Sequence, residues 1–277
     1  MPATGVGEDI RWWCYRYGGK GALIRAYHNG IQIGQTTVVE KPSLRGHEHL
    51  RVAEIGHNFV EANFRRKGVF SKIISAMERF VSSRGISLLY VTPNQQSETA
   101  YRKLSYEFHK NPSGLLLLKC DQQRPDFDED ALAEISLDTY IALTAANRRL
   151  LVGDKSYFRW RFARPGLGYR FFRSDNLAAV FAVRPGNPGP ISVTIMAELF
   201  IDGDKPAPSA ALGVAQQVSS YLPNWHPVIY QSGEPLAVQN DEIIYYRNFP
   251  LAYKVLDRRR FTFPPLRCYQ FTDSDYA

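Results

Sequence analysis

The chain has 277 residues, of which 44% are hydrophobic and 22% charged. This composition is typical of a soluble globular protein and excludes disordered and fibrous classes. Lysines and arginines number 34 against 27 aspartates and glutamates, a formal net charge of +7. The excess is uneven, because residues 1–120 hold 17 basic and 9 acidic residues whereas residues 121–277 hold 17 and 18. An anionic partner is therefore expected to bind the first part of the chain.

The cysteines and the start of the chain indicate the compartment. Cys14, Cys120 and Cys268 lie too far apart in sequence for a local zinc site, and their odd number argues against a disulfide framework. Residues 1–5 carry no leader-like pattern, and no apolar run approaches the roughly 20 residues of a membrane span. The histidines show no metal-ligand spacing. We expect a cytoplasmic protein without a metal or a membrane segment.

The first part of the chain is predicted to alternate strands and helices. Asn29-Gly30 is a good two-residue hairpin turn, and Phe70 to Val81 repeats apolar residues at three- and four-residue steps, which predicts a helix ending near Arg84-Gly85. A strand at 115–118 is expected to close this part. The remaining predicted elements are strands at 22–27, 31–39, 50–60 and 86–91 and a short helix at 97–104.

Residues 121–130 are acidic and polar and contain a proline, which favours a linker and a division into domains 1–122 and 123–277. The second part is predicted to form similar elements in a similar order, a weak internal repeat without visible sequence identity. They are a helix at 131–151, a hairpin at 169–173 and 177–183, a strand at 191–201, a helix at 210–221, a strand at 227–231 and a final pair at 243–246 and 251–255.

The segment Arg65-Arg66-Lys67-Gly68-Val69-Phe70-Ser71 carries the strongest chemical signal. It lies between a predicted strand and a predicted helix, where successive backbone N–H groups and a glycine form a cradle for an anion. Two arginines and a lysine add charge suited to a phosphate. A basic triplet beside one glycine is also common in solvated surface turns, so the rest of the pattern has to support the cradle.

Three further pieces follow the same order and spacing over residues 20–118. With Val60, the basic segment, Asn94 and Tyr101-Arg102-Lys103-Leu104-Ser105-Tyr106, the chain resembles the GNAT superfamily of acyl-CoA-dependent N-acyltransferases. The resemblance implies an α/β fold with an α+β mixed sheet in the first part and a second, GNAT-like part. Two residues depart from the family pattern: Phe70 replaces a small residue and Ser105 a glycine.

The resemblance also implies roles for individual residues. Acetyl-CoA is the expected co-substrate, with its pantetheine arm against the backbone of Phe59 and Val60 and against Asn94. Tyr101 is expected to protonate the departing thiolate; without the family context it would be interpreted as a core aromatic residue. The residues expected to hold the pyrophosphate by amides or charge are Arg65, Arg66, Lys67, Gly68, Val69, Phe70 and Ser71.

Two residues compete for the role of catalytic base. Glu54 stands six residues before Val60, where histone-type members of the superfamily carry a glutamate, and we prefer it on that ground. His57 is the rival, since histidine titrates near neutral pH. Strand alternation predicts that the two side chains point to opposite faces. The structural alternatives are a surface role or a pairing with Arg51 for Glu54, and a buried structural histidine for His57.

The second part shows no comparable cradle. The corresponding segment at 201–208 contains two prolines, which lack amide donors, and two aspartates, which repel phosphate. The run at 157–162 alternates aromatic and basic residues. Its aromatic rings are expected to pack in the core; the alternative is an acceptor wall that stacks on sugar rings. We therefore expect the second part to lack donor binding and to contribute to the acceptor pocket.

The leading hypothesis is an enzyme that transfers an acetyl group from acetyl-CoA to a primary amine of a small molecule, with an amino sugar or sugar nucleotide as the preferred acceptor. The alternative is a catalytically inactive acyl-CoA-binding or interaction module derived from the same superfamily. Nucleic-acid binding rests on the basic first part alone and lacks a motif, so we expect no nucleic-acid partner. The oligomeric state is left open.

Overall fold

The chain forms two compact units in the computed structural model. The first unit comprises Met1–Lys110, Leu150–Trp160 and Pro250–Pro264, and the second comprises Asn111–Arg149, Arg161–Phe249 and Pro265–Ala277. Each unit is therefore built from separated stretches of the sequence. The structure describes residues 12, 21–44, 46, 49–109, 113–118, 132–147, 151–152, 155–164, 166–186, 192–201, 208–221, 228–232 and 243–257.

A six-stranded mixed sheet in the order β1-β2-β4-β5-β15-β6 forms the first unit. Only β4 and β5 are parallel neighbours; the other pairs are antiparallel. A separate pair joins β3 (Ser43–Leu44) to β9 (Leu151–Val152). The sheet strands are β1 (Gly21–His28), β2 (Ile31–Lys41), β4 (Val52–Val60), β5 (Leu88–Val91), β15 (Ala252–Val255) and β6 (Glu107–Phe108).

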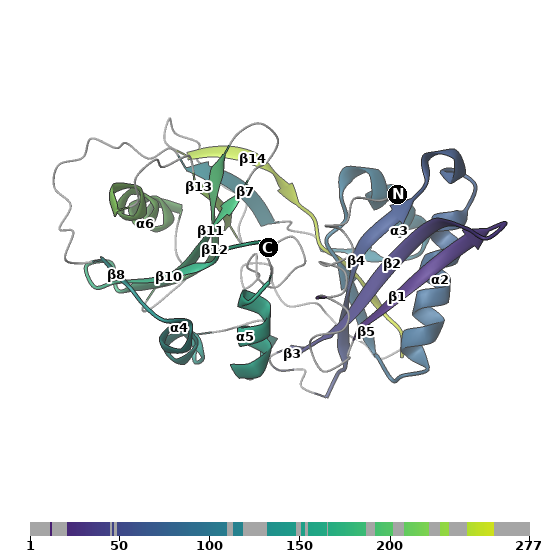
Figure 1. The fold of residues 1–277 in the computed structure, drawn as a ribbon, viewed down its shortest axis with the longest axis horizontal. Coiled ribbons are helices and arrows are strands. Elements are labelled where there is room, and N and C mark those ends of the chain that lie inside the picture. The colour runs from purple at the N-terminus through teal and green to yellow at the C-terminus, as the bar shows by residue number, and fades with distance from the viewer. Residues whose placement is uncertain are drawn as a thin grey trace. The chain divides into compact units, whose positions relative to one another are not determined.

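Helix α2 (Val69–Ser82) follows a 3₁₀ turn (Ala62–Phe64) and lies along the sheet, while α3 (Gln95–Lys103) follows β5 (Figure 1). The apolar repeat that predicts α2 is the face it buries, through Ile73, Ile74, Met77 and Val81. Its last turn is closed by N–H donation from Gly85 to Ser82 O, with Gly85 at φ +76°. This helix and its glycine stop are confirmed.

The second unit contains a seven-stranded sheet in the order β14-β7-β13-β12-β11-β10-β8. Its parallel pair is β12 with β13. Its strands are β7 (Ser113–Leu118), β8 (Leu132–Glu134), β10 (Arg170–Ser174), β11 (Ala179–Gly186), β12 (Val193–Ile201), β13 (Val228–Ser232) and β14 (Ile243–Phe249). Its helices are α4 (Leu137–Thr144) and α6 (Pro208–Tyr221), whereas most of α5 (Lys155–Phe162) belongs to the first unit. None of the described helices is long and apolar enough to cross a membrane.

The helix predicted at 131–151 is wrong in extent. Residues 132–134 instead form β8, which pairs with β10, and α4 begins after Ser136, whose hydroxyl accepts a hydrogen bond from the N–H of Thr139. Helix α5 was not predicted as an element. The extent of β8 is decided by its pairing with β10, a contact distant in sequence that hydrophobic periodicity does not reveal.

The two sheets share one plan, as the weak repeat predicts. The series β1, β2, β4, α2, β5 corresponds to β10, β11, β12, α6, β13, with the single parallel pair at the same position. This bears out the mixed α/β class and the repeat of one architecture in the second part.

The strand that follows the parallel pair in each sheet comes from the other half of the sequence. β15 pairs with β5 and β6 in the first sheet, and β7 lies between β13 and β14 in the second (Figure 1). The expectation that 115–118 closes the first part is therefore wrong, and 251–255 does not pair with 243–246. Both strands are short and apolar, so their sequences suit a central position in either sheet.

Lys254 on β15 anchors this incoming strand. Its Nζ is 3.0 Å from both carboxylate oxygens of Glu78 on α2 and donates to the backbone oxygen of Leu104 at the end of α3, at 2.9 Å. The ammonium also lies 5.4 Å from the centre of the Tyr106 ring. Lys254 thus links α2 and α3, the two helices that carry the motif residues.

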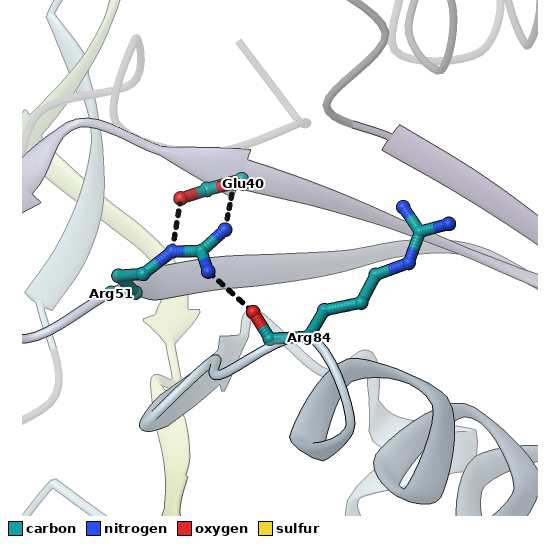
Figure 2. A network of polar contacts seen from close by, with 3 residues as sticks. All are labelled: Glu40, Arg51 and Arg84. Atoms are coloured by element: carbon teal, nitrogen blue, oxygen red, sulfur yellow. Dashed lines mark hydrogen bonds and ion pairs between the residues drawn. The ribbon is translucent and has the colours of Figure 1, made fainter.

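A second polar contact ties the C-terminal end of α2 to the sheet. Arg51, just before β4, donates from Nε and Nη2 to the two carboxylate oxygens of Glu40, each at 2.9 Å, and from Nη1 to the backbone oxygen of Arg84 (Figure 2). The hydrogen bond to Glu40 and its charge raise the pKa of Arg51. Arg51 therefore pairs with Glu40, whereas Glu54 lies 2.6 Å from Lys41 Nζ.

Replacing Lys254 by methionine is expected to lower the free energy of unfolding by about 1–2 kcal/mol, because it removes a charged hydrogen bond and an ion pair that are largely shielded from water. Arg173→Met is the matched control, since it breaks an exposed ion pair with Asp175 that is expected to contribute under about 1 kcal/mol. Urea denaturation measures both. Equal losses in the two variants would show that Lys254 does not anchor the strand.

Candidate active site

The segment between β4 and α2 forms the predicted anion cradle. Gly68 caps α2 with φ +77°, and no side chain caps this end. The N–H of Lys72 donates to Gly68 O at 3.1 Å. The N–H groups of Val69, Phe70 and Ser71 then have no acceptor within the helix. Arg66 also has a positive φ, +61°. Left-handed residues in such a turn direct backbone N–H groups to one side, as in anion-binding nests.

The cradle is open and positively charged. Arg65, Arg66, Lys67 and Gly68 are exposed, and a Cβ placed on Gly68 would meet no atom within 4 Å. The N-terminal end of a helix carries partial positive charge, which adds to that of the three side chains. The segment thus has the donors, the charge and the space that a phosphate group needs.

Strand β4 parts from β5 on its way to the cradle. The two strands pair only over Val52–Glu54 and Leu88–Tyr90, whereas β4 continues to Val60 beside β2. Beyond Glu54, the edge of β4 on the side of β5 is therefore no longer paired with β5. An extended ligand can pair along this edge as an added strand would. Phe59 is exposed, and the carbonyl oxygen of Val60 accepts a hydrogen bond from Arg65 Nε at 3.0 Å.

Phe70, which departs from the family pattern, does not block the space at Gly68. Its ring packs edge-on against Tyr101, with centroids 5.3 Å apart, so it supports α3 from the start of α2. Ser105, the other departure, has φ +63°, the left-handed conformation for which a glycine is usual. Phe70 thus has a packing role, and Ser105 keeps the backbone conformation of the glycine that it replaces.

Tyr101 is fully buried on α3, and its hydroxyl meets β4. Asn58 Nδ2 donates to the tyrosine oxygen at 3.0 Å, and the hydroxyl of Thr36 on β2 donates to Asn58 Oδ1 at 2.7 Å. Asn58 and Thr36 were not identified from the sequence. Their only signal there was that Asn58 lies on the strand that ends at Val60 and Thr36 on the predicted strand at 31–39. Asn94 lies apart from this chain of contacts: it is exposed and caps α3 by accepting from Ser97 N at 2.9 Å.

A β-bulge in β4 changes which face His57 takes. The register against β2 shifts between Gln35 and Thr37, and His57 has φ +46°. His57 Nδ1 lies 3.1 Å from the hydroxyl of Thr37, while Asn58 contacts Thr36. Because neighbouring residues of β2 point to opposite faces, His57 and Asn58 lie on opposite sides of the sheet.

The same contacts overturn the expectation that Glu54 and His57 point to opposite faces. Glu54 Oε2 lies 2.6 Å from Lys41 Nζ, and Lys41 and Thr37 share one face of β2 because they are four residues apart. Glu54 and His57 are therefore on one face, since the extra residue of the bulge interrupts the alternation. Neither side chain of the Lys41–Glu54 pair is exposed, whereas His57 is half-buried.

The aromatic run at 157–162 is helix α5, and its rings are packed as the core interpretation expects. Tyr157 is fully buried, and Trp160 stacks on Trp12 with ring centroids 4.6 Å apart. The segment predicted to have lost donor binding falls mostly on residues 202–207, outside the described residues. The division of roles at residue 122 and the contribution of the second part to the acceptor pocket stay predictions. Among the residues that the structure describes, no cluster of three or more metal-ligating side chains is present.

Comparisons with known proteins agree with the motif. Residues 3–106 match the acetyltransferase (GNAT) family model. A GCN5-related N-acetyltransferase from Anabaena variabilis superposes with a TM-score of 0.64 at 12% identity, over 93% of this chain and 67% of that one. No curated protein sequence matches the chain.

Two further structures cover most of both chains. A putative acetyltransferase from Pyrococcus horikoshii has a TM-score of 0.62 at 12% identity, over 100% of this chain and 86% of that one. A tandem GNAT protein from the clavulanic acid biosynthesis pathway has a TM-score of 0.56 at 12% identity, over 91% and 88%. At these identities the likeness establishes the fold, which extends across both units.

The Lys41–Glu54 pair is expected to act as a structural unit. Glu54→Gln leaves the ammonium of Lys41 buried without its carboxylate and is expected to cost about 3–5 kcal/mol, whereas replacing both by methionine is expected to cost much less. Urea denaturation of the single and double variants tests this. A double variant no more stable than Glu54→Gln would contradict a structural pair.

Proposed function

We propose that this chain, whose residues 3–106 match the acetyltransferase (GNAT) family model, transfers an acetyl group from acetyl-CoA to a primary amine of a small molecule. The observation that carries the proposal is the uncapped start of α2 at Gly68, beside three basic residues and at the end of a strand that has parted from its neighbour. An amino sugar or sugar nucleotide is the acceptor class to test first.

The residues present suit each part of the co-substrate. The amides of Val69, Phe70 and Ser71 are placed to bind the pyrophosphate, with Arg66 and Lys67 adding charge. The parted edge of β4 offers backbone groups to the pantetheine arm. The carbonyl of Val60 becomes available once Arg65 turns from it toward a phosphate. Asn94 keeps its amide nitrogen for the arm while its oxygen caps α3.

The reaction requires few proton transfers. The amine nitrogen forms a bond to the thioester carbon, and the carbon–sulfur bond breaks with its electron pair on sulfur. A base takes the proton lost by the amine, and the hydroxyl of Tyr101 gives its proton to the sulfur; the phenolate then recovers a proton from solvent. Holding the amine against the thioester supplies most of the rate, because a thiolate leaves readily.

His57 is the base that we favour over Glu54. The motif position alone favours Glu54, but that carboxylate is engaged in an ion pair with the ammonium of Lys41 at 2.6 Å. His57 is half-buried, sits at the bulge where β4 leaves β5, and has the left-handed backbone that is often found at functional sites. The hydroxyl of Thr37 orients its ring from Nδ1.

Gly68→Asp is expected to weaken acetyl-CoA binding at least about tenfold, equivalent to 1.4 kcal/mol, because a carboxylate would then face the phosphates. Isothermal titration calorimetry measures the affinity. Gly166→Asp is the matched control, since Gly166 also has φ +76° with no atom within 4 Å of its Cβ position. Unchanged binding in Gly68→Asp, or no saturable binding by the parent protein, would contradict the proposal.

His57→Gln is expected to lower kcat about a hundredfold or more while leaving acetyl-CoA affinity nearly unchanged, since a general base contributes roughly 10²–10⁴ to rate. Thiol release from acetyl-CoA across a panel of amines and amino sugars gives the rate, and added imidazole should restore part of it. A parental rate in His57→Gln, together with a lost rate in the stable Lys41→Met/Glu54→Met variant, would assign the base to Glu54. Tight binding without thiol release from any amine would favour the inactive binding module.

A further inference from the structure

We propose that Asn58 is a positioning residue that holds the hydroxyl of Tyr101 as a proton donor, and that Thr36 orients the Asn58 amide for this task. The proposal rests on the proposed function, because it concerns the proton that Tyr101 gives to the departing thiolate. Three elements meet in it: Thr36 on β2, Asn58 on the bulge of β4 and Tyr101 on α3.

The direction of the hydrogen bonds is the core of the argument. An asparagine amide has a donating nitrogen and an accepting oxygen. The Thr36 hydroxyl lies 2.7 Å from Asn58 Oδ1 and 3.4 Å from the carbonyl oxygen of Thr37, so its single proton is best used toward Asn58. With the amide oxygen engaged on that side, the nitrogen faces Tyr101 and donates to the phenol oxygen at 3.0 Å.

A phenol that accepts a hydrogen bond does not spend its own proton on that contact. The O–H of Tyr101 is therefore directed to an acceptor other than Asn58. A donated N–H also favours the phenolate that forms when the proton leaves, since hydrogen bonding to a charged form stabilises it. Asn58 would thus act twice, first by orienting the acid and then by stabilising its conjugate base.

The surroundings hold the three groups in place. Thr36 and Tyr101 are fully buried, and the Tyr101 ring is enclosed edge-on by Phe70 at 5.3 Å and by Tyr106 at 4.9 Å. Asn58 is half-buried at the point where β4 has left β5. A side chain at this place can contact both the core and a ligand lying along the parted strand, which a residue within the paired stretch cannot do.

The test compares Asn58→Ala, Asn58→Asp and Thr36→Val. Asn58→Ala is expected to lower kcat about tenfold or more with KM for acetyl-CoA changed less than about threefold. Asn58→Asp is expected to lose more, because a carboxylate accepts the tyrosine proton instead of donating to its oxygen. Thr36→Val is expected to lose several-fold. Thr144→Val is the control, a fully buried threonine whose hydroxyl donates to Tyr140 O in the second unit.

A double-mutant cycle separates positioning from a merely structural role. If Asn58 acts through Tyr101, then Asn58→Ala has little further effect on kcat in a Tyr101→Phe background, whereas a general loss of stability would add in full. Equal losses in both backgrounds, or activity retained by Asn58→Asp, would overturn the proposal. Retention in Asn58→Asp would mean that Tyr101 donates to residue 58.

A second readout does not depend on turnover. The phenol of Tyr101 can be followed by NMR with ¹³C-labelled tyrosine, its signal assigned by Tyr101→Phe. Loss of the donor in Asn58→Ala is expected to move the ¹³Cζ signal of Tyr101, because the phenol oxygen then no longer accepts a hydrogen bond from residue 58. A parent protein that releases no thiol refutes the proposed function, while an unchanged Tyr101 signal in Asn58→Ala refutes the contact proposed here.

Discussion

The exchange of one strand between the halves of the chain is the constraint on which the rest of the structure depends. β15, which comes after the whole second sheet in sequence, pairs with β5 and places Lys254 against Glu78 of α2 and the carbonyl of Leu104. These two helices carry the cradle and Tyr101. β7 completes the second sheet in the same way. Each sheet therefore contains a strand that is distant in sequence from its neighbours, and contacts of this kind slow folding because a long loop has to close first.

The site itself depends on one irregular strand. β4 is parallel to β5 for three residues and then parts from it, and the bulge at His57 adds a residue to the stretch that is left. The parting leaves backbone groups for an extended ligand. The bulge places His57 on one face and Asn58 on the other, so the proposed base and the residue proposed to hold Tyr101 lie next to each other in sequence. In a regular strand the side chains of residues 54 and 57 would point to opposite faces; a bulge re-aims a side chain.

Several charged side chains and two left-handed residues lie on this strand or next to it. The excess of basic residues in the first part includes the exposed Arg65, Arg66 and Lys67 beside the open start of α2, where they are placed to attract an anion. The buried ion pair of Lys41 with Glu54 lies on the face that also holds His57. Two of the five described non-glycine residues with a positive φ, His57 and Arg66, lie on this strand and in the turn that follows it. Such conformations cost energy and persist at places that function requires.

Local patterns in the sequence determined the elements whose signals lie within a few residues. The apolar repeat and Gly85 define α2, Asn29-Gly30 defines the first hairpin, and Gly68 with its basic neighbours marks the cradle. Only the tertiary structure decided the partners of β7 and β15, the short extent of α4, the face taken by His57, and the contact of Asn58 with Tyr101. Periodicity reports which side chains are apolar and how they are spaced. The choice of neighbour and the place of a bulge depend on hydrogen bonds and packing between residues far apart in sequence, which spacing does not encode.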